Sequence, residues 1–476
     1  MVCTIQGEIV LPTLSQVLPP LDDKSAQPLY QQLQRALRGA IENRVIGPDD
    51  AAYDPARITF NGMIDRRPAL VTRPLDVDDV VAAVGYAVES DLPIAVRGGG
   101  HSVAGHCIGD GGVVVDLRLM RDVTVDPEAR VATCGGGALW EDLDPPCLRH
   151  GLATPGGTFG DTGVAGLTLG GGIGHLIGLH GLTLDNVLAA TVVTADGEVL
   201  RATEDKNSEL FWALRGGGGN FGVVTDFTFR LHPVGQVLAG QLVFSPADAV
   251  AVLSKWRDLT QRAPDELACF GFVARSSVSE AEGAIVAVAY FGEDRREGEE
   301  LISDLLDDPE PLVNTLRPMY YAELQEIFGR MPFGLRNYWS GRFLRELPDE
   351  LIRLAADHLS EGVDGSIMFE PIYGAAARVP PEATAFAGRE AAYNATFLGV
   401  WEDAADDEER IASARGFTSL LAPWATGGGY INYASESVGD GLQTEYGTER
   451  YARLRDVKRR YDPDNRFRFN HNISPD

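Results

Sequence analysis

Lysine, cysteine and long apolar runs are all scarce in this chain. Lysine occurs at only four positions, against 69 Asp and Glu residues, and the formal net charge is −28. A surface this acidic repels phosphate and lacks the basic stripe that a nucleic-acid-binding protein needs, so no nucleic-acid partner is expected. No stretch of about 18 apolar residues is present, so the sequence predicts no membrane-spanning helix and no membrane partner. The acidic, lysine-poor composition fits a salt-adapted protein and a GC-rich genome equally well.

The five cysteines do not form a disulfide framework. Their number is odd and no C-x-x-C pair occurs. They are spread along the chain at Cys3, Cys107, Cys134, Cys147 and Cys269. This usage indicates a reducing compartment. The first residues contain no basic segment followed by a sustained apolar one, so no signal peptide is predicted and the expected location is the cytoplasm.

Length and overall composition are those of an ordinary globular protein. At roughly 100–200 residues per domain, 476 residues allow two or three domains. Hydrophobic residues make up 44% and charged residues 23% of the chain, which excludes a disordered or collagen-like protein. Glycine is unevenly distributed, since 28 of the 54 glycines fall within residues 98–222. Because glycine admits close backbone approach, the loops of this region are expected to bring bare backbone close to another group, whose nature the composition leaves open.

Local patterns predict a chain that mixes helices and strands. Helices are predicted at 28–43, 77–87, 139–150, 208–214, 247–262, 297–306, 349–359, 408–421 and 449–460. Strands are predicted at 94–96, 113–115, 131–132, 192–194, 223–231, 284–290, 367–372 and 396–401. The step Ala195-Asp196-Gly197 between two β-branched runs predicts a hairpin turn.

The first of three glycine-rich motifs is Arg97-Gly98-Gly99-Gly100-His101-Ser102, into which the strand at 94–96 runs. Successive backbone N–H groups in such a turn form a nest that binds an anion such as pyrophosphate. The histidine at its edge fits a base, a metal ligand or a covalent anchor, or is incidental to a tight turn. A zinc cluster with His106 and Cys107 lacks a fourth ligand at a recognised spacing.

The second motif combines Thr154-Pro155-Gly156-Gly157-Thr158 with the run from Gly163 to Gly174, where small and aliphatic residues alternate. Two glycine-rich loops in series suit one extended ligand better than a buried structural loop. The third motif, Gly217-Gly218-Gly219-Asn220-Phe221-Gly222, formally matches G-x-G-x-x-G. A dinucleotide fingerprint follows a strand and opens a helix, whereas here a helix precedes and a strand follows, so the Rossmann interpretation is rejected.

Together these motifs resemble FAD-linked oxidases. The matching segments are 97–102, 157–174, 181–186 and 211–222, and the C-terminal segments 430–433 and 461–473 resemble the closing motifs of the same proteins. Specifically, the resemblance is to the berberine-bridge-enzyme-like and 6-hydroxy-D-nicotine oxidase group. It covers about residues 68–231 and 427–473.

The resemblance implies a two-domain α+β fold of the vanillyl-alcohol-oxidase type. Residues 1–236 are expected to form the FAD-binding domain, with 1–25 as a lead-in. Residues 237–424 are expected to form an α/β substrate-binding domain, an antiparallel sheet covered by helices, and residues 425–476 to return to the FAD-binding domain. The implied cofactor is FAD, and the implied partners are a small-molecule substrate and O2. No metal is implied.

The resemblance also implies individual cofactor contacts. His101 stands at the position that bonds to the flavin 8α-methyl group. Many members have a second link from a cysteine in a Gly-Thr-Cys context; this chain has Gly157-Thr158-Phe159, so one covalent bond and no cysteinyl link is expected. Val224 is expected at the adenine and Thr162 at a position that gates oxygen. The full set of further expected contacts is Arg97, Gly98, Gly99, Gly100, Ser102, Thr158, Thr162, Gly163, Gly166, Gly170, Gly174, Val224, Tyr430, Asn432, Asn470 and Asn472.

Tyr433 stands where related enzymes place a catalytic base. It is expected to take a proton from the substrate while a hydride passes to flavin N5 and O2 is reduced to H2O2. Because an ordinary tyrosine pKa of about 10 is unsuited to this task at neutral pH, a neighbouring cation or hydrogen-bond donor is expected to stabilise the phenolate. The expected substrate is an alcohol, sugar or amine. Aromatic candidates for its pocket are Tyr320, Tyr321, Tyr338, Trp339, Tyr373 and Trp401.

Three alternatives to a flavin oxidase stay open at this point. The first is a flavin dehydrogenase that uses another electron acceptor, and the second is a non-catalytic flavin-binding protein. The third is a zinc enzyme that uses His101, His106 and Cys107, for which no stoichiometric zinc is expected. The retained Tyr433 beside Asn432 favours an active enzyme over the second alternative.

Overall fold

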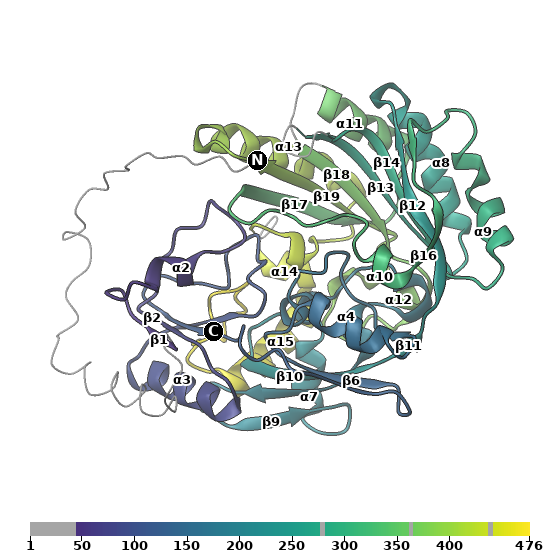
Figure 1. Ribbon diagram of the computed structural model, residues 1–476. Helices are drawn as coiled ribbons and strands as arrows, with labels where there is room; N and C mark the ends of the chain where they lie inside the picture. Colours follow the sequence, from purple (N-terminus) through teal and green to yellow (C-terminus); the bar gives the residue numbers. More distant parts are fainter. Residues whose placement is uncertain (1–43, 277–280, 361–364, 437–440) are drawn as a thin grey trace.

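The computed structural model describes most of the chain from residue 44 onward. The described residues are 44–276, 281–360, 365–436 and 441–476. The helix predicted over 28–43 and the lead-in predicted over 1–25 lie outside them. Two small sheets form an N-terminal part (residues 44–233), one large sheet forms a large-sheet part (236–401), and the C-terminal segment (425–476) lies where these parts meet (Figure 1).

The first small sheet has its strands in the order β1-β2-β4-β3. They are β1 (Val45–Ile46), β2 (Leu70–Thr72), β3 (Ile94–Arg97) and β4 (Val113–Asp116). The last three are parallel and buried, as their unbroken apolar runs require. The short helix α2 (Tyr53–Arg57) packs beside this sheet. The helix predicted from residue 77 is α3 (Val77–Glu89), and its N-cap Asp76 accepts a hydrogen bond from the Asp79 N–H.

The second small sheet is antiparallel, in the order β5-β6-β10-β8-β9. Its strands are β5 (Val123–Asp126), β6 (Val131–Gly135), β8 (Val187–Val193), β9 (Val199–Ala202) and β10 (Val223–Arg230), and a separate pair joins β7 (Leu152–Ala153) to β11 (His232–Pro233). The hairpin predicted at 195–197 joins β8 to β9 and is confirmed. The predicted short helices are α4 (Trp140–Leu148) and α7 (Ser208–Leu214). Since α7 precedes the G-x-G-x-x-G match and β10 follows it, the rejection of a Rossmann fingerprint is confirmed.

One segment expected to be a loop is partly helical. The run from Gly163 to Gly174 contains α5 (Val164–Gly170), and α6 (Ile177–His180) follows it. Val164, Ala165, Thr168 and Leu169 are buried on one face of α5, whereas Gly166 is exposed on the opposite face. Glycine is a poor helix former, so its abundance concealed this helix in the sequence.

The large sheet is antiparallel and has the order β15-β12-β14-β13-β18-β19-β17, with β16 also paired to β12. Its strands are β12 (Gln236–Phe244), β13 (Leu267–Ser276), β14 (Ala281–Tyr290), β15 (Val313–Asn314), β16 (Arg317–Tyr320), β17 (Arg336–Leu344), β18 (Gly365–Pro371) and β19 (Tyr393–Trp401). Within this sheet, the sequence patterns missed β12, β13, β15, β16 and β17. The division into domains at residues 236 and 424 stays a prediction.

Helices cover the face of the large sheet that points away from the N-terminal part (Figure 1). They are α8 (Ala249–Arg262), α11 (Asp349–Ser360) and α13 (Asp407–Leu420), with α9 (Arg295–Ile302) at one side and the short α10 (Tyr321–Leu324) and α12 (Gly374–Arg378) in connections. Trp256 of α8 and Phe417 of α13 belong to the same buried core as Phe369 of β18. The helices predicted near 247, 297, 349 and 408 are thereby confirmed.

Buried Lys458, one of the four lysines, anchors the C-terminal segment. It lies on α15 (Thr448–Tyr461), which follows α14 (Leu442–Tyr446). Its Nζ donates to the carbonyl of Asn220 at 2.8 Å, donates to the carbonyl of Phe467 at 2.9 Å, and pairs with Asp462 at 2.6 Å. This cluster brings residues 467–473 against the third glycine-rich motif.

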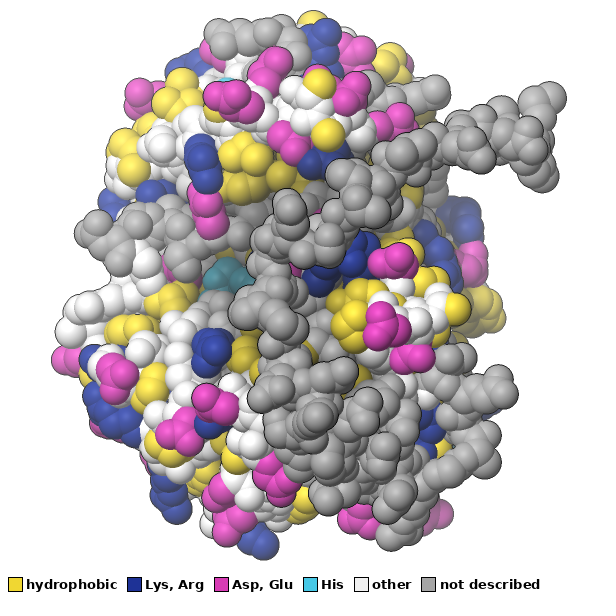
Figure 2. Space-filling model, turned by 90° about the vertical axis from the view of Figure 1, so that its left-hand side faces the viewer, with side chains coloured by type: hydrophobic (Ala, Val, Ile, Leu, Met, Phe, Trp, Pro, Cys, Tyr) yellow, Lys and Arg dark blue, Asp and Glu magenta, His cyan; other side chains and the backbone are white. Residues whose placement is uncertain are grey.

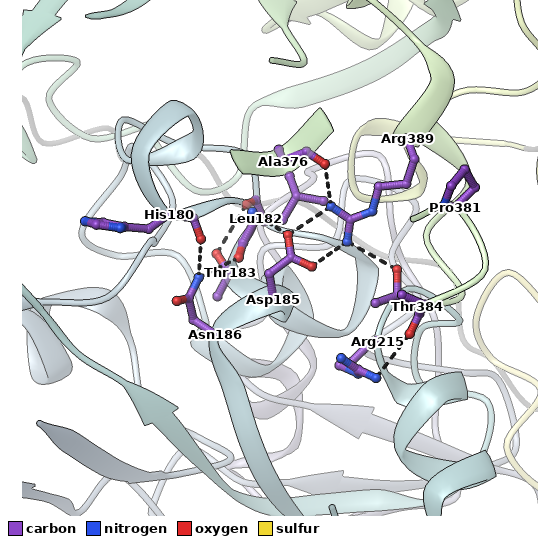
Figure 3. A network of polar contacts seen from close by, with 12 residues as sticks. His180, Leu182, Thr183, Asp185, Asn186, Arg215, Ala376, Pro381, Thr384 and Arg389 are labelled. Carbon is purple, nitrogen blue, oxygen red and sulfur yellow. Dashed lines mark hydrogen bonds and ion pairs between the residues drawn. The ribbon is translucent and has the colours of Figure 1, made fainter. Parts of the chain in front are cut away.

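A buried arginine joins the β18–β19 connection to the N-terminal part (Figure 3). Arg389 lies on a single 3-10 turn (Ala387–Glu390), and Asp185 on another (Thr183–Asn186). The guanidinium, whose side chain is 1% exposed, pairs with both carboxylate oxygens of Asp185 and also donates to the Ala376 carbonyl and the Thr384 hydroxyl. Its two terminal nitrogens therefore bind Asp185 across the interface and Ala376 and Thr384 within the β18–β19 connection itself.

Arg389→Gln is expected to lower the free energy of unfolding by about 3–5 kcal/mol, because the variant leaves Asp185 buried without its partner. Arg378→Gln is the matched control, since the Arg378 side chain is 62% exposed in its pair with Asp265 and should contribute nothing measurable. Guanidinium chloride unfolding, followed by tryptophan fluorescence, measures both. Equal midpoints for the two variants would contradict this role of Arg389.

Candidate active site

A cavity lies where the N-terminal part, the large sheet and the C-terminal segment meet. Its wall contains ten glycines and several aromatic side chains, and within the described ranges it has no Asp, Glu, Lys or Arg. The three glycine-rich motifs all contribute to it, together with strands β3 and β10. In the space-filling view, a histidine side chain is visible in a hollow among hydrophobic side chains (Figure 2). The cavity thus offers mostly backbone and apolar surface to a ligand.

Most residues predicted to contact a cofactor line this cavity, together with Tyr433. They are Gly98, Gly99, Gly100, His101, Ser102, Thr158, Thr162, Gly163, Gly166, Val224, Tyr430, Asn432 and Asn470. The structure therefore brings residues from five separate segments of the chain (98–102, 158–166, 224, 430–433 and 470) onto one surface.

Four predicted residues do not line the wall, namely Arg97, Gly170, Gly174 and Asn472. The side chain of Arg97 turns away from the cavity, because it donates to the carbonyl of Ala56 at 2.5 Å and lies 3.9 Å from the carboxylate of Asp116. Its charge is compensated inside the N-terminal part.

The two glycines among these four serve packing rather than the cavity surface. A Cβ at Gly170 would lie 2.0 Å from Oδ1 of Asn432, and a Cβ at Gly174 would lie 1.9 Å from the carbonyl oxygen of Gly156. Asn472 lies next to the wall, and its Oδ1 is buried without a hydrogen-bond partner in the part of the chain that is described.

The first glycine-rich turn touches the start of α5 through bare backbone. A Cβ at Gly99 would lie 2.5 Å from the backbone nitrogen of Gly163, and a Cβ at Gly163 would lie 2.4 Å from that of Gly99. No side chain fits at either position. By contrast, a Cβ at Gly166 or Gly219 would meet nothing within 4 Å, because these two glycines face the open cavity.

His101 is held in one orientation at the wall. Its ring stacks on Phe60 with 4.6 Å between ring centres, and it meets the edge of Phe333 at 5.2 Å. Its Nε2 lies 3.5 Å from Oδ1 of Asp161. Asp161 was not singled out in the sequence, although an acid two residues before a glycine-rich helix start was visible there.

Tyr433 contacts an acid. It belongs to a 3-10 turn (Ile431–Tyr433), and its hydroxyl donates to Oε1 of Glu370 on β18 at 3.3 Å. The other carboxylate oxygen of Glu370 accepts a hydrogen bond from Nδ2 of Asn394 on β19 at 2.7 Å. The expectation of a cation or hydrogen-bond donor beside Tyr433 is therefore wrong, because this neighbour is an acceptor.

Burial sets the proton affinities of this pair. Burial raises the pKa of Glu370 to about 7, against the lowering effect of the hydrogen bonds from Asn394 and Tyr433. Burial and then the charge of Glu370 raise the pKa of Tyr433 well above its ordinary value. The tyrosine is thus a neutral donor at neutral pH, and Glu370 is the group that changes protonation. A proton that reaches the Tyr433 hydroxyl can pass to the carboxylate.

Glu370 was missed because a strand pattern hid it. It is a single acid between Phe369 and Pro371 in a predicted buried strand, and it is 2% exposed. Burying a single charged side chain in an otherwise apolar strand costs free energy. That cost was the only sign in the sequence that Glu370 has a role beyond the strand.

Aromatic side chains surround the Tyr433 end of the cavity. Of the six aromatic candidates, Trp339 lines the wall, with its ring centre 5.8 Å from that of Tyr433. Tyr321, Tyr338, Tyr373 and Trp401 pack in hydrophobic clusters, and Tyr320 is exposed. Trp339 lies on β17, which the sequence patterns did not predict.

Two further histidines line the cavity, with 4.6 Å between their ring centres. Burial lowers the pKa of His106 well below its ordinary value, and the charges of His471 and Arg66 add to this effect. Burial also lowers the pKa of His471 to about 4. Both rings are therefore neutral at neutral pH. Within the described ranges, no three His, Cys, Asp or Glu side chains are placed to hold a metal ion, and no helix has the length and apolar character to cross a membrane.

Two family models match segments that build this cavity. One describes an FAD binding domain and matches residues 68–203. The other describes berberine and berberine-like proteins and matches residues 429–474. The first range contains His101 and α5, and the second contains Tyr433 and Asn470.

Individual proteins match nearly the whole chain. The (R)-6-hydroxynicotine oxidase of Paenarthrobacter nicotinovorans is 33% identical over 92% of this chain and 98% of its own length. The crystal structure of 6-hydroxy-D-nicotine oxidase from Arthrobacter nicotinovorans superposes with a TM-score of 0.83 at 32% identity, covering 92% of this chain and 99% of that one. Glucooligosaccharide oxidase from Acremonium strictum, whose FAD is described as 6-S-cysteinyl and 8α-N1-histidyl, has a TM-score of 0.82 at 25% identity and covers 93% and 99%. The expected α+β fold class is confirmed.

Gly166→Val is expected to abolish FAD binding without weakening the fold. The valine side chain would enter the cavity, since a Cβ at this position meets nothing within 4 Å, and valine suits a helix at least as well as glycine. The visible absorbance of the purified protein measures FAD content, and thermal unfolding of the cofactor-free chain measures stability. Gly85→Val on the surface of α3, where a Cβ also meets nothing within 4 Å, is the control and should keep full FAD. Full FAD content in Gly166→Val would remove α5 from the cofactor site.

Proposed function

This chain belongs to the FAD-linked oxidoreductases of the berberine-bridge-enzyme-like group, and we propose that it is an oxidase of a small alcohol, sugar or amine that holds its flavin through one covalent bond to His101. The observation that supports this best is the buried Tyr433–Glu370 pair at one end of the glycine-lined cavity that also contains His101. The substrate classes follow from the relatives, which are named as oxidases of 6-hydroxynicotine and of an oligosaccharide.

The residues present fit an FAD molecule. The turn at 98–102 offers successive backbone N–H groups that suit the diphosphate, and among the described residues of the wall no carboxylate repels it. Gly166 and Gly219 leave open space where a side chain would stand. Oδ1 of Asn470, which lines the cavity, is buried without a partner in the described ranges, so it can accept a hydrogen bond from a ligand.

One covalent bond is proposed rather than two. Phe159 occupies the position where many relatives carry the second, cysteinyl link, and it lines the cavity. Cys107 also lines the cavity, but outside that context, and its Sγ lies 3.9 Å from the Gly100 carbonyl. His101 is then the covalent anchor.

When bound, FAD accepts a hydride at N5 and reduces O2 to H2O2. The chain supplies the proton acceptor. A substrate O–H or N–H donates to the hydroxyl of Tyr433, which donates its own proton to Glu370, and Asn394 keeps the carboxylate oriented. Trp339 and the other aromatic rings at this end exclude water and hold an apolar part of the substrate.

The wall beside Thr162 is proposed to admit oxygen. Thr162 lines the cavity, and its small side chain leaves that position open. Flavin reduced with dithionite in the absence of air should therefore regain its oxidised spectrum within seconds of air admission, with one H2O2 formed per flavin. Reoxidation over many minutes, together with fast reoxidation by a quinone, would instead indicate a dehydrogenase. A peroxide-coupled screen of alcohols, sugars and amines identifies the substrate for the tests that follow.

Tyr433→Phe and Glu370→Gln are each expected to slow reduction of the flavin by substrate about 100-fold or more, because each removes one member of the proton path. In the wild type, the reduction rate should rise with pH through about 7, since only the ionised form of Glu370 accepts a proton. Glu370→Gln should lose that rise. Tyr338→Phe, on β17 but in the core, is the control and should reduce at the normal rate. Stopped-flow absorbance under anaerobic conditions measures all four proteins, and an unimpaired Tyr433→Phe variant would remove Tyr433 from the mechanism.

A further inference from the structure

Asp161 faces the histidine proposed to hold the flavin. Its Oδ1 lies 3.5 Å from Nε2 of His101, and the two side chains are 12% and 13% exposed. Both atoms are buried, and neither has a hydrogen-bond partner within the ranges described. Because unpaired buried polar atoms are costly, two such atoms 3.5 Å apart are placed to pair with each other.

The backbone contact of Gly99 with Gly163 brings these side chains together. His101 follows Gly99 by two residues, and Asp161 precedes Gly163 by two. Because the backbones of Gly99 and Gly163 are in contact, the residues two positions away from them, His101 and Asp161, lie close to each other. Phe60 stacks on the imidazole and Phe333 meets it edge-on, so the ring is clamped with Nε2 toward Asp161. Nδ1 is then the ring nitrogen left to react.

We propose that Asp161 is the positioning residue for covalent attachment of FAD, with its carboxylate holding the Nε2–H of His101 so that the Nδ1 lone pair forms the bond to the flavin 8α carbon. This inference rests on the proposed covalent link to His101. A carboxylate that orients a histidine in this way fixes the tautomer and raises the basicity of the opposite nitrogen.

Covalent attachment of the flavin is a two-electron oxidation, and its atoms and electrons balance when O2 is the oxidant. One C–H bond of the 8α-methyl group and the N–H bond of the imidazole are replaced by one C–N bond. The two electrons released enter the flavin, and O2, the acceptor of the proposed oxidase, takes them with the two protons to form H2O2. Positive charge develops on the imidazole as Nδ1 bonds, and the facing carboxylate stabilises it and then accepts the Nε2 proton.

The surroundings keep Asp161 ionised. Burial raises its pKa, but the contact with His101 and the charges of His101 and Arg330 outweigh burial and lower the pKa below its ordinary value. Arg330 itself pairs with Glu141. At neutral pH, Asp161 is therefore a carboxylate that can accept the imidazole proton.

The test adds FAD to cofactor-free protein and follows the covalent adduct by intact mass and by flavin fluorescence of the denatured chain in a gel. Asp161→Asn should form the adduct roughly 10- to 100-fold more slowly than the wild type. Asp161→Glu should recover part of the rate, and added formate should accelerate Asp161→Ala. Glu326→Gln is the matched control, and this variant should form the adduct at the normal rate. Gly160 precedes Asp161 in the same loop, and a Cβ placed on Gly160 would lie 3.5 Å from Oε1 of Glu326, so the variant removes a second acid close to that loop.

The affinity for FAD in the absence of the covalent bond distinguishes a positioning role of Asp161 from a structural one. Fluorescence titration with FAD should give the same affinity for His101→Ala and for the double variant His101→Ala, Asp161→Asn, and a large loss in the double variant would overturn the proposal.

Nuclear magnetic resonance of the isolated flavin peptide should show attachment through Nδ1; attachment through Nε2 would also overturn it. Equal coupling rates for wild type and Asp161→Asn would refute the role of Asp161 alone. A wild type that never forms the adduct would refute the covalent link itself.

Discussion

The turn after β3 and the start of α5 approach each other so closely that neither Gly99 nor Gly163 has room for a Cβ. This contact closes one side of the cavity, and the other features of the site are arranged around it. It sets His101 against Asp161, directs the exposed face of α5 toward the open space, and leaves a wall made mainly of backbone. A diphosphate can be bound by such a wall through N–H groups, without a basic side chain.

The proposed chemistry depends on a second constraint, the burial of one carboxylate. Glu370 comes from the large sheet, whereas Tyr433 comes from the C-terminal segment, so the pair forms only when these two parts of the chain are in contact. Burial brings the pKa of Glu370 to about 7, where the group can both take and release a proton. The buried Lys458 and the Arg389–Asp185 pair hold the contributing segments in place.

The sequence motifs contain most residues of the cavity wall, but none of them pointed to Glu370, which contacts the wall residue Tyr433 without lining the wall itself. The glycine runs, His101 and Tyr433 lie in local motifs whose spacing is legible without a structure. Most helices and several strands were also predicted, because their apolar periodicity is regular. Strand β17 was missed, and so was Glu370, whose partners Asn394 on the neighbouring strand β19 and Tyr433 in the C-terminal segment are not visible in any local pattern. Helix α5 was hidden by its glycines, and nothing local in the sequence shows that the side chain of Arg97 turns to Ala56.

The central claim is that one FAD molecule fills the glycine-lined cavity, with its ring system between His101 and Tyr433. A crystal structure of the protein purified with FAD tests this most directly. The account predicts continuous electron density from His101 into the isoalloxazine ring, with the diphosphate against residues 98–102 and Tyr433 facing the ring. Flavin density located elsewhere, or a ring that lies out of reach of both His101 and Tyr433, would contradict it.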